Sequence, residues 1–132
     1  MANQSFFWIK ASPFLLSVLR IITGFLFMQH GAQKLFGLLG GTPVHLFSLM
    51  GLAGVLEFFG GLLVLIGLTT RPVAFVLSGQ MAFAYFMVHN PVNFWPILNH
   101  GDPAVMFCFV FLYLSAAGAG PWSVDHVWLR RR

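Results

Sequence analysis

Long apolar stretches constrain this chain more than any other feature of its sequence. Four of them, separated by short polar segments, approach the roughly 20 residues that a helix needs to cross a bilayer. Charged residues make up only 8% of the 132 residues, whereas hydrophobic residues make up 58%. A soluble domain carries about 25% charged residues, because its surface must be hydrated. The sequence therefore predicts an all-α integral membrane protein, a four-helix transmembrane bundle in one domain of residues 1–132.

The expected boundaries of these spans rest on prolines that follow a polar residue. This pairing is typical of a helix N-cap followed by proline in the first turn. It recurs at Ser12-Pro13, Thr42-Pro43 and Asp102-Pro103, and at Thr70-Arg71-Pro72 with one residue between. The predicted spans are residues 14–36, 43–67, 72–90 and 103–119. A cleaved signal peptide does not fit the N-terminus, because Arg20 interrupts the apolar core and no small-residue cleavage site follows it.

Lysine and arginine are distributed unevenly around the spans. An even number of spans places both termini on one side, and that side holds Lys10, Arg71 and the arginines at 130–132, whereas the other side holds Lys34. Positive flanks mark the cytoplasmic face. We therefore expect cytoplasmic termini in a multi-pass protein of the inner (plasma) membrane, with residues 91–101 either lying in the outer interface or folded back over the outer end of the bundle. The basic tail beside a span predicts contact with the lipid bilayer and no nucleic-acid partner.

Polar and small residues follow one face of each of the first three spans. At 100° per residue, these faces contain Arg20, Thr23, Gly24, Phe27, His30, Gly31 and Lys34 in the first span, Gly54, Glu57 and Gly61 in the second, and Arg71, Ser78, Ala82, Tyr85 and His89 in the third. Charged groups at membrane depth face protein or water rather than lipid. We therefore expect the three faces to meet inside the bundle.

The depth of two charged residues predicts an intramembrane ion pair. Glu57 falls near the midplane, and Arg20 lies about two turns inside the cytoplasmic surface, within reach of it. An Arg20–Glu57 pair would let both charges be tolerated. Two interpretations stay open at this point: the pair fixes helix packing, or Glu57 carries protons or contacts a ligand.

A second polar group is expected at the outer ends of the first and third spans. It comprises His30, Gln33, Lys34 and His89, together with Asn90, Asn99, His100 and Asp102 of the adjoining loop. Such convergence is typical of a small-molecule site, here roofed by Phe94 and Trp95. The alternative is that the histidines are only hydrogen-bonded anchors. A quinone ring would suit the site, with its tail between helices.

Other cofactors and catalytic arrangements are disfavoured. His30 and His89 could clamp a b-type haem, but no second pair accompanies them, so haem is not expected. No cluster has metal-ligand spacing, which predicts no metal site. Cys108 is the single cysteine of the chain, which excludes a CxxC redox pair. No catalytic residue can be assigned.

Five segments resemble, in order, motifs of the DoxX-like family of small four-helix membrane proteins. They are HGAQKLFG at 30–37, GVLEFFGG at 54–61, LTTR at 68–71, VH at 88–89 and GPWSVD at 120–125. The last departs from the family pattern, because Pro121 and Trp122 stand where a basic residue and an aromatic are usual. The resemblance implies functional roles for Arg20, His30, Gln33, Lys34, Glu57, Arg71 and His89.

The family is similar to the small membrane subunit of archaeal thiosulfate:quinone oxidoreductase, and other members are associated with redox defence. The resemblance therefore implies an accessory subunit of a membrane redox system, which binds a quinone or similar small molecule in an outward-facing pocket. If the chain takes part in catalysis, it would do so as a quinone-linked oxidoreductase subunit. The alternatives are a small proton-coupled transporter or solute-binding protein using Glu57, and a ligand-free scaffold. Expected partners are redox subunits and a second copy, contacted through residues 114–118 or the glycines of the second span.

Overall fold

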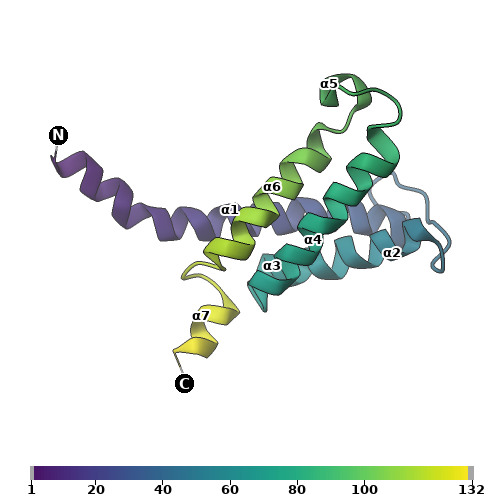
Figure 1. Ribbon diagram of the computed structural model, residues 1–132. Coiled ribbons are helices and arrows are strands. Elements are labelled where there is room, and N and C mark those ends of the chain that lie inside the picture. The colour runs from purple at the N-terminus through teal and green to yellow at the C-terminus, as the bar shows by residue number, and fades with distance from the viewer. Residues whose placement is uncertain (1, 131–132) are drawn as a thin grey trace.

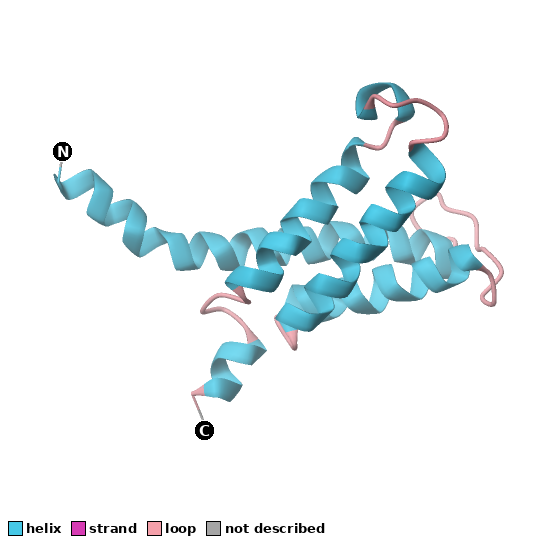
Figure 2. Ribbon diagram, viewed as in Figure 1, coloured by secondary structure: helices cyan, strands magenta, loops and turns pink. Residues whose placement is uncertain are grey.

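The computed structural model describes residues 2–130, and helices are its only regular structure in that range (Figures 1 and 2). The helix nearest the N-terminus is α1, Ala2–Phe36. The second helix is continuous and consists of α2 (Leu49–Val55), the π-helical segment η1 (Leu56–Gly60) and α3 (Gly61–Ile66). The third consists of α4 (Thr70–Ala84) and the π-helical η2 (Tyr85–His89). They are followed by α5 (Pro96–Asn99), α6 (Asp102–Ala117) and α7 (Val124–Leu129).

Three helices in the described part of the chain are long and apolar enough to cross a membrane. They are Ser5–Phe36, Leu49–Ile66 and Thr70–His89, and α6 is a shorter apolar helix of 16 residues. The predicted all-α membrane fold is confirmed. The orientation of the termini stays a prediction.

Two of the predicted helix starts are wrong. The helix α1 continues through Pro13 to Ala2, and its N-terminal part bends away from the rest in Figure 1, as expected of a proline inside a helix. The second helix begins at Leu49 rather than at Pro43, because Ser48 is its N-cap: the Ser48 hydroxyl accepts a hydrogen bond from the Gly51 amide at 3.0 Å. The segment α7 was not predicted.

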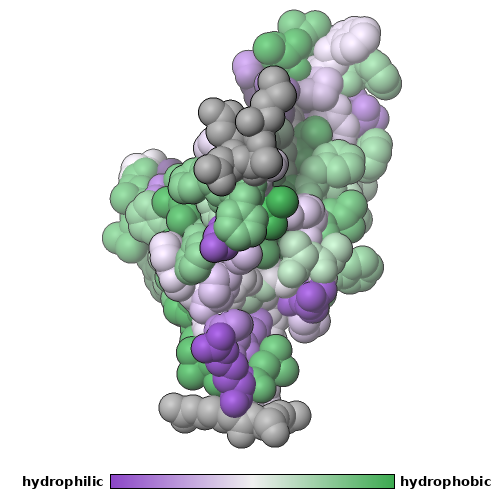
Figure 3. Space-filling model, turned by 90° about the vertical axis from the view of Figure 1, so that its left-hand side faces the viewer, coloured by the Kyte–Doolittle hydropathy of each residue, from purple (hydrophilic) through white to green (hydrophobic). Residues whose placement is uncertain are grey.

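The helices are arranged as two antiparallel pairs that cross each other (Figure 1). In one pair α1 packs along α2, η1 and α3, and in the other α4 packs along α6. The core lies where the pairs meet and contains Phe27, Val64, Leu77, Phe111 and Leu114, each almost fully buried. The face seen in Figure 3 is mostly apolar, with hydrophilic residues gathered near α7 at its lower end. Such a surface suits a lipid environment.

Glycines allow α1 and the second helix to approach closely. A Cβ on Gly24 would lie 2.6 Å from the backbone nitrogen of Leu65, and one on Gly61 would lie 2.8 Å from that of Met28. Small residues at such contacts are typical of helix packing in membranes. The glycines of the second helix that were expected to support self-association are therefore used in packing within the chain. Whether the protein forms oligomers stays a prediction.

Candidate functional site

A cavity of about 590 Å³ opens between the two helix pairs, and we call it the outer cavity. Its walls are mostly apolar and come from α1, the second helix, α4 with η2, and the start of α6. Its polar side chains are His30, Lys34, Glu57, Gln80 and His89. Four of these five residues were predicted as ligand-binding residues from the sequence, and Gln80 was not.

The polar floor of the outer cavity is an ion pair supported by an amide. The Lys34 ammonium donates hydrogen bonds to both carboxylate oxygens of Glu57, at 2.6 and 2.7 Å. The Gln80 amide nitrogen donates to the same carboxylate at 3.2 Å. Glu57 is almost fully buried, with 4% of its side chain exposed, whereas Lys34 retains 24%. The pair therefore places one positive and one negative charge in an apolar setting with no net charge.

The predicted Arg20–Glu57 pair is wrong, because Glu57 pairs with Lys34. The physical reason is the register between the two antiparallel helices. Gly31 lies against Phe58 and Gly24 against Leu65, so Glu57 is level with the last turns of α1, whereas Arg20 lies beside the end of α3. Lys34, in the last turn of α1, lies beside that part of the second helix, because the two helices are antiparallel neighbours.

Arg20 is fully buried and binds backbone carbonyls instead of a carboxylate. Its guanidinium donates to Val64 and Ala119, both at 2.7 Å, and also to Leu65 and Trp122. These bonds join α1 to the end of α3 and to the segment that leads into α7. Arg20 is therefore a structural residue at the end of the bundle remote from Lys34, and it does not line the outer cavity.

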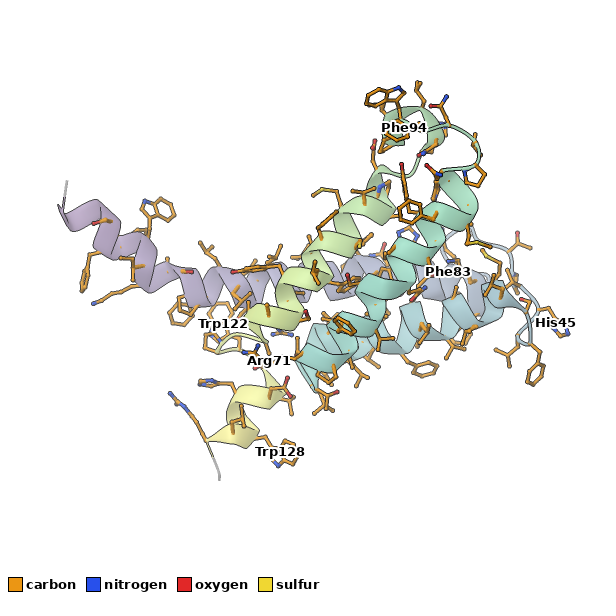
Figure 4. All side chains as sticks on the ribbon, viewed as in Figure 1. His45, Arg71, Phe83, Phe94, Trp122 and Trp128 are labelled. Atoms are coloured by element: carbon orange, nitrogen blue, oxygen red, sulfur yellow. The ribbon has the colours of Figure 1, made fainter. Side chains whose placement is uncertain are left out.

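Two further charged residues hold helix ends near Arg20. The Asp125 carboxylate accepts hydrogen bonds from the amides of Thr69 and Thr70, at 2.7 and 2.8 Å, and so caps the N-terminus of α4. Arg71 donates to the carbonyls of Ser115, Ala116 and Ala117 at the end of α6 (Figure 4). The LTTR and GPWSVD motifs therefore meet in space as a set of helix caps, which explains Arg71 without a ligand.

The two histidines of the outer cavity have different surroundings. His30 is exposed, and its ring packs edge-on against Phe107 with centroids 6.1 Å apart. His89 is half-buried, and its Nδ1 donates to the Asn99 carbonyl at 3.0 Å. This bond fixes the tautomer of a neutral ring, so that Nε2 of His89 is a hydrogen-bond acceptor.

Several residues expected at this site do not line the cavity. Gln33 donates to the Leu39 carbonyl at 3.0 Å, outside the cavity. Asn99 is buried and organises its own loop, donating to the Asn93 carbonyl at 2.8 Å. The expected roof is wrong, because Phe94 and Trp95 are exposed and do not line the cavity. Figure 4 shows Phe94 beside α5. Asn90, His100 and Asp102 are also absent from its lining.

Two features of the site were missed by the sequence analysis. Gln80 is a polar residue within an apolar run, which is the signal in the sequence that could have found it. The π-helical segments η1 and η2 contain Glu57 and His89, and such segments change the direction of side chains relative to a regular α-helix. Among residues 2–130, no group of three His, Cys, Asp or Glu side chains could hold a metal ion.

The chemistry available in the outer cavity suits a neutral molecule with a polar head. Lys34 and the ring of His30 can donate hydrogen bonds to carbonyl oxygens, while Nε2 of His89 can accept one from a hydroxyl. The apolar walls suit a ring or chain, and a few polar groups in an apolar cavity are typical of small-molecule sites.

Comparisons with known proteins place the chain in a family. The sequence model of the DoxX family matches residues 15–90. An uncharacterized protein of Haemophilus influenzae is 35% identical over 129 residues, which cover 92% of this chain and 96% of that protein. The inner membrane protein YqjF of Escherichia coli is 32% identical over 123 residues, covering 83% and 88% of the two chains. No solved structure gives a significant match. The match to the family model and the similarity to these relatives show that the chain belongs to the DoxX family, and its apolar helices make it a multi-pass protein of the inner membrane.

Proposed function

We propose that this protein is an accessory subunit of a membrane redox system and binds a quinone, or a similar small molecule, in the outer cavity. The observation that carries the proposal is the Lys34–Glu57 pair at the floor of an apolar cavity of about 590 Å³. A cavity of this size accommodates a drug-sized ring system. The accessory role follows from the family resemblance, and partner subunits would carry out the electron transfer.

The polar groups of the cavity suit both forms of a quinone. In the oxidised form the two ring oxygens accept hydrogen bonds, which Lys34 and His30 can donate. In the reduced form each ring hydroxyl can also donate a bond, which Nε2 of His89 can accept. Phe27 and Phe107 line the same cavity and offer apolar contact to the ring.

The ion pair favours this proposal over a proton-coupled transporter. In the transporter alternative Glu57 takes up and releases a proton while its surroundings change. Both oxygens of Glu57 are engaged by Lys34, and one of them also accepts a bond from Gln80. No feature of the described residues favours the transporter in a comparable way.

The test is equilibrium binding of a tritiated decylubiquinone to the purified protein in lipid nanodiscs. His30→Ala and His89→Ala should each weaken binding at least tenfold. The exposed His30 should leave the thermal unfolding midpoint unchanged, whereas His89→Ala also loses the bond to the Asn99 carbonyl and should lower the midpoint slightly while the protein still folds. His45→Ala is the matched control, since His45 is an exposed histidine in the loop after α1 and does not line the cavity (Figure 4). If the wild-type protein binds no quinone analogue, the proposed function is wrong.

A further inference from the structure

The apolar walls of the outer cavity are themselves exposed on the outside of the helices. On α2 the exposed lining residues are Leu49, Met50 and Leu52, and on the third helix they are Val76, Gly79, Phe83, Met87 and Val88. A side chain that both lines a cavity and is exposed lies at the opening. Most of these residues lie on α2 and α4 with η2, so the main opening is sideways between α2 and α4, and the exposed lining residues His30 and Pro103 mark a smaller one on the side of α1 and α6.

The packing of the helices explains where this opening lies. The extended contacts between the second and third helices are made by η1 and α3 with α4, and the helices diverge from there toward α2 and η2 (Figure 1). The segments α2 and η2 belong to two helices that are long and apolar enough to cross a membrane, Leu49–Ile66 and Thr70–His89. An opening on the side of two helices that cross a bilayer lies at the depth of the hydrocarbon core, where lipid is the neighbouring solvent.

Gly79 lies at this opening and leaves it wide. A Cβ built on Gly79 meets no atom within 4 Å, whereas one on Gly24, Gly61 or Gly31 would meet backbone atoms at less than 3 Å. The absence of a side chain at position 79 is therefore not explained by helix packing. It does keep the entrance to the Lys34–Glu57 floor clear.

The charge balance limits what can enter. Lys34 and Glu57 neutralise each other in a mostly apolar cavity, so an ionic ligand would add an uncompensated charge that is costly in such a setting. A neutral molecule avoids this cost and can also dissolve in the bilayer.

We propose that the gap between α2 and α4 is a lateral portal through which a neutral, lipid-dissolved molecule enters from the bilayer, passing Gly79 to reach the Lys34–Glu57 pair. This inference rests on the proposed function for the identity of the ligand, but the portal can be tested separately.

The first experiment measures passage through the portal. The association rate of tritiated decylubiquinone is measured in nanodiscs for Gly79→Trp and for the matched control Phe75→Trp, one turn earlier on α4, exposed and outside the cavity lining. Gly79→Trp should slow association at least tenfold, and Phe75→Trp should change it less than twofold. Equal rates for the two variants, with the wild type binding normally, would overturn the portal and leave the proposed function intact.

The second experiment tests, without any ligand, whether the opening is exposed to lipid. In a Cys108→Ala background, Gly79→Cys and the control Phe75→Cys are spin-labelled, and their collision rates with oxygen and with a water-soluble nickel chelate are measured in nanodiscs. A portal open to lipid predicts high oxygen and low nickel access at both positions. Dominant nickel access at position 79 would overturn the portal, because the gap would then be open to water. Low access of both reagents at position 79 would also overturn it, because another chain or segment would then cover the gap. If oxygen access is high but no quinone binds, the portal stands and the quinone proposal fails.

Discussion

The Lys34 ammonium and the Glu57 carboxylate form a bidentate contact, with the nitrogen 2.6 and 2.7 Å from the two oxygens. The contact joins the last turn of α1 to the π-helical part of the second helix. It therefore combines two roles, because it fixes the relative position of two helices and supplies the polar floor of the outer cavity.

Breaking this pair on one side should cost more stability than removing it completely. Removing one partner of a buried pair leaves the other charge uncompensated, at about 3–5 kcal/mol when both are fully buried. Because Lys34 is partly exposed, we expect Lys34→Met and Glu57→Gln each to lie at or below the lower end of that range. The double variant should recover much of the loss, as measured by a double-mutant cycle of unfolding in detergent. Additive losses would show that the two residues are not coupled. Arg20→Met is the control, because combining it with Glu57→Gln should recover none of the lost stability.

Arg20 should be irreplaceable by lysine, although the charge is the same. The guanidinium reaches four carbonyls in two parts of the chain, the end of α3 and the segment that leads into α7, whereas an ammonium has a different shape and fewer donors. We expect Arg20→Lys to cost about 1.5–3 kcal/mol, the range for a hydrogen bond to a charged group. Hydrogen exchange should also become faster in residues 118–129, which Arg20 joins to the bundle. Lys10→Arg, at an exposed lysine, is the control, and unchanged exchange in Arg20→Lys would contradict this role.

The features that could be predicted from the sequence are those that the residues of a single segment determine. The lengths of the apolar stretches and the inward face of the first helix follow from the residues of one segment. Accordingly, Arg20, Thr23, Gly24, Phe27 and Gly31 are buried as expected, whereas Lys34 of the same predicted face is half-buried and His30 is exposed.

Features that depend on the register between two helices could not be predicted in this way. The partner of Glu57 depends on the register between α1 and the second helix, which is set by close contacts such as Gly24 against Leu65 and Gly31 against Phe58. The π-helical segments break the assumption of 100° per residue at Glu57 and His89. The partners of Arg20 and Arg71 are backbone carbonyls, which carry no sequence signature at all.

The orientation in the membrane is a prediction that follows from the distribution of positive charge. Both termini should be cytoplasmic, because lysines and arginines gather on their side. A reporter fused after Arg132 should therefore be active only in the cytoplasm, and one inserted in residues 91–101 only outside. The opposite pattern would reverse the orientation and would place the opening of the outer cavity in the cytoplasmic half of the bilayer.

Two glycines of the bundle should respond oppositely to the same substitution. In Gly61→Ala the new Cβ would lie 2.8 Å from the Met28 backbone nitrogen and 3.0 Å from the Gly24 carbonyl oxygen. Backbone atoms cannot rotate away, so α1 and α3 must separate, at a cost of about 1–3 kcal/mol for overpacking. Gly79→Ala meets nothing within 4 Å and should leave the unfolding midpoint unchanged or slightly raised, because alanine favours helix. Thermal unfolding of both variants in the same detergent is the measurement, and equal midpoints would show that the close approach of α1 and α3 is not required for stability.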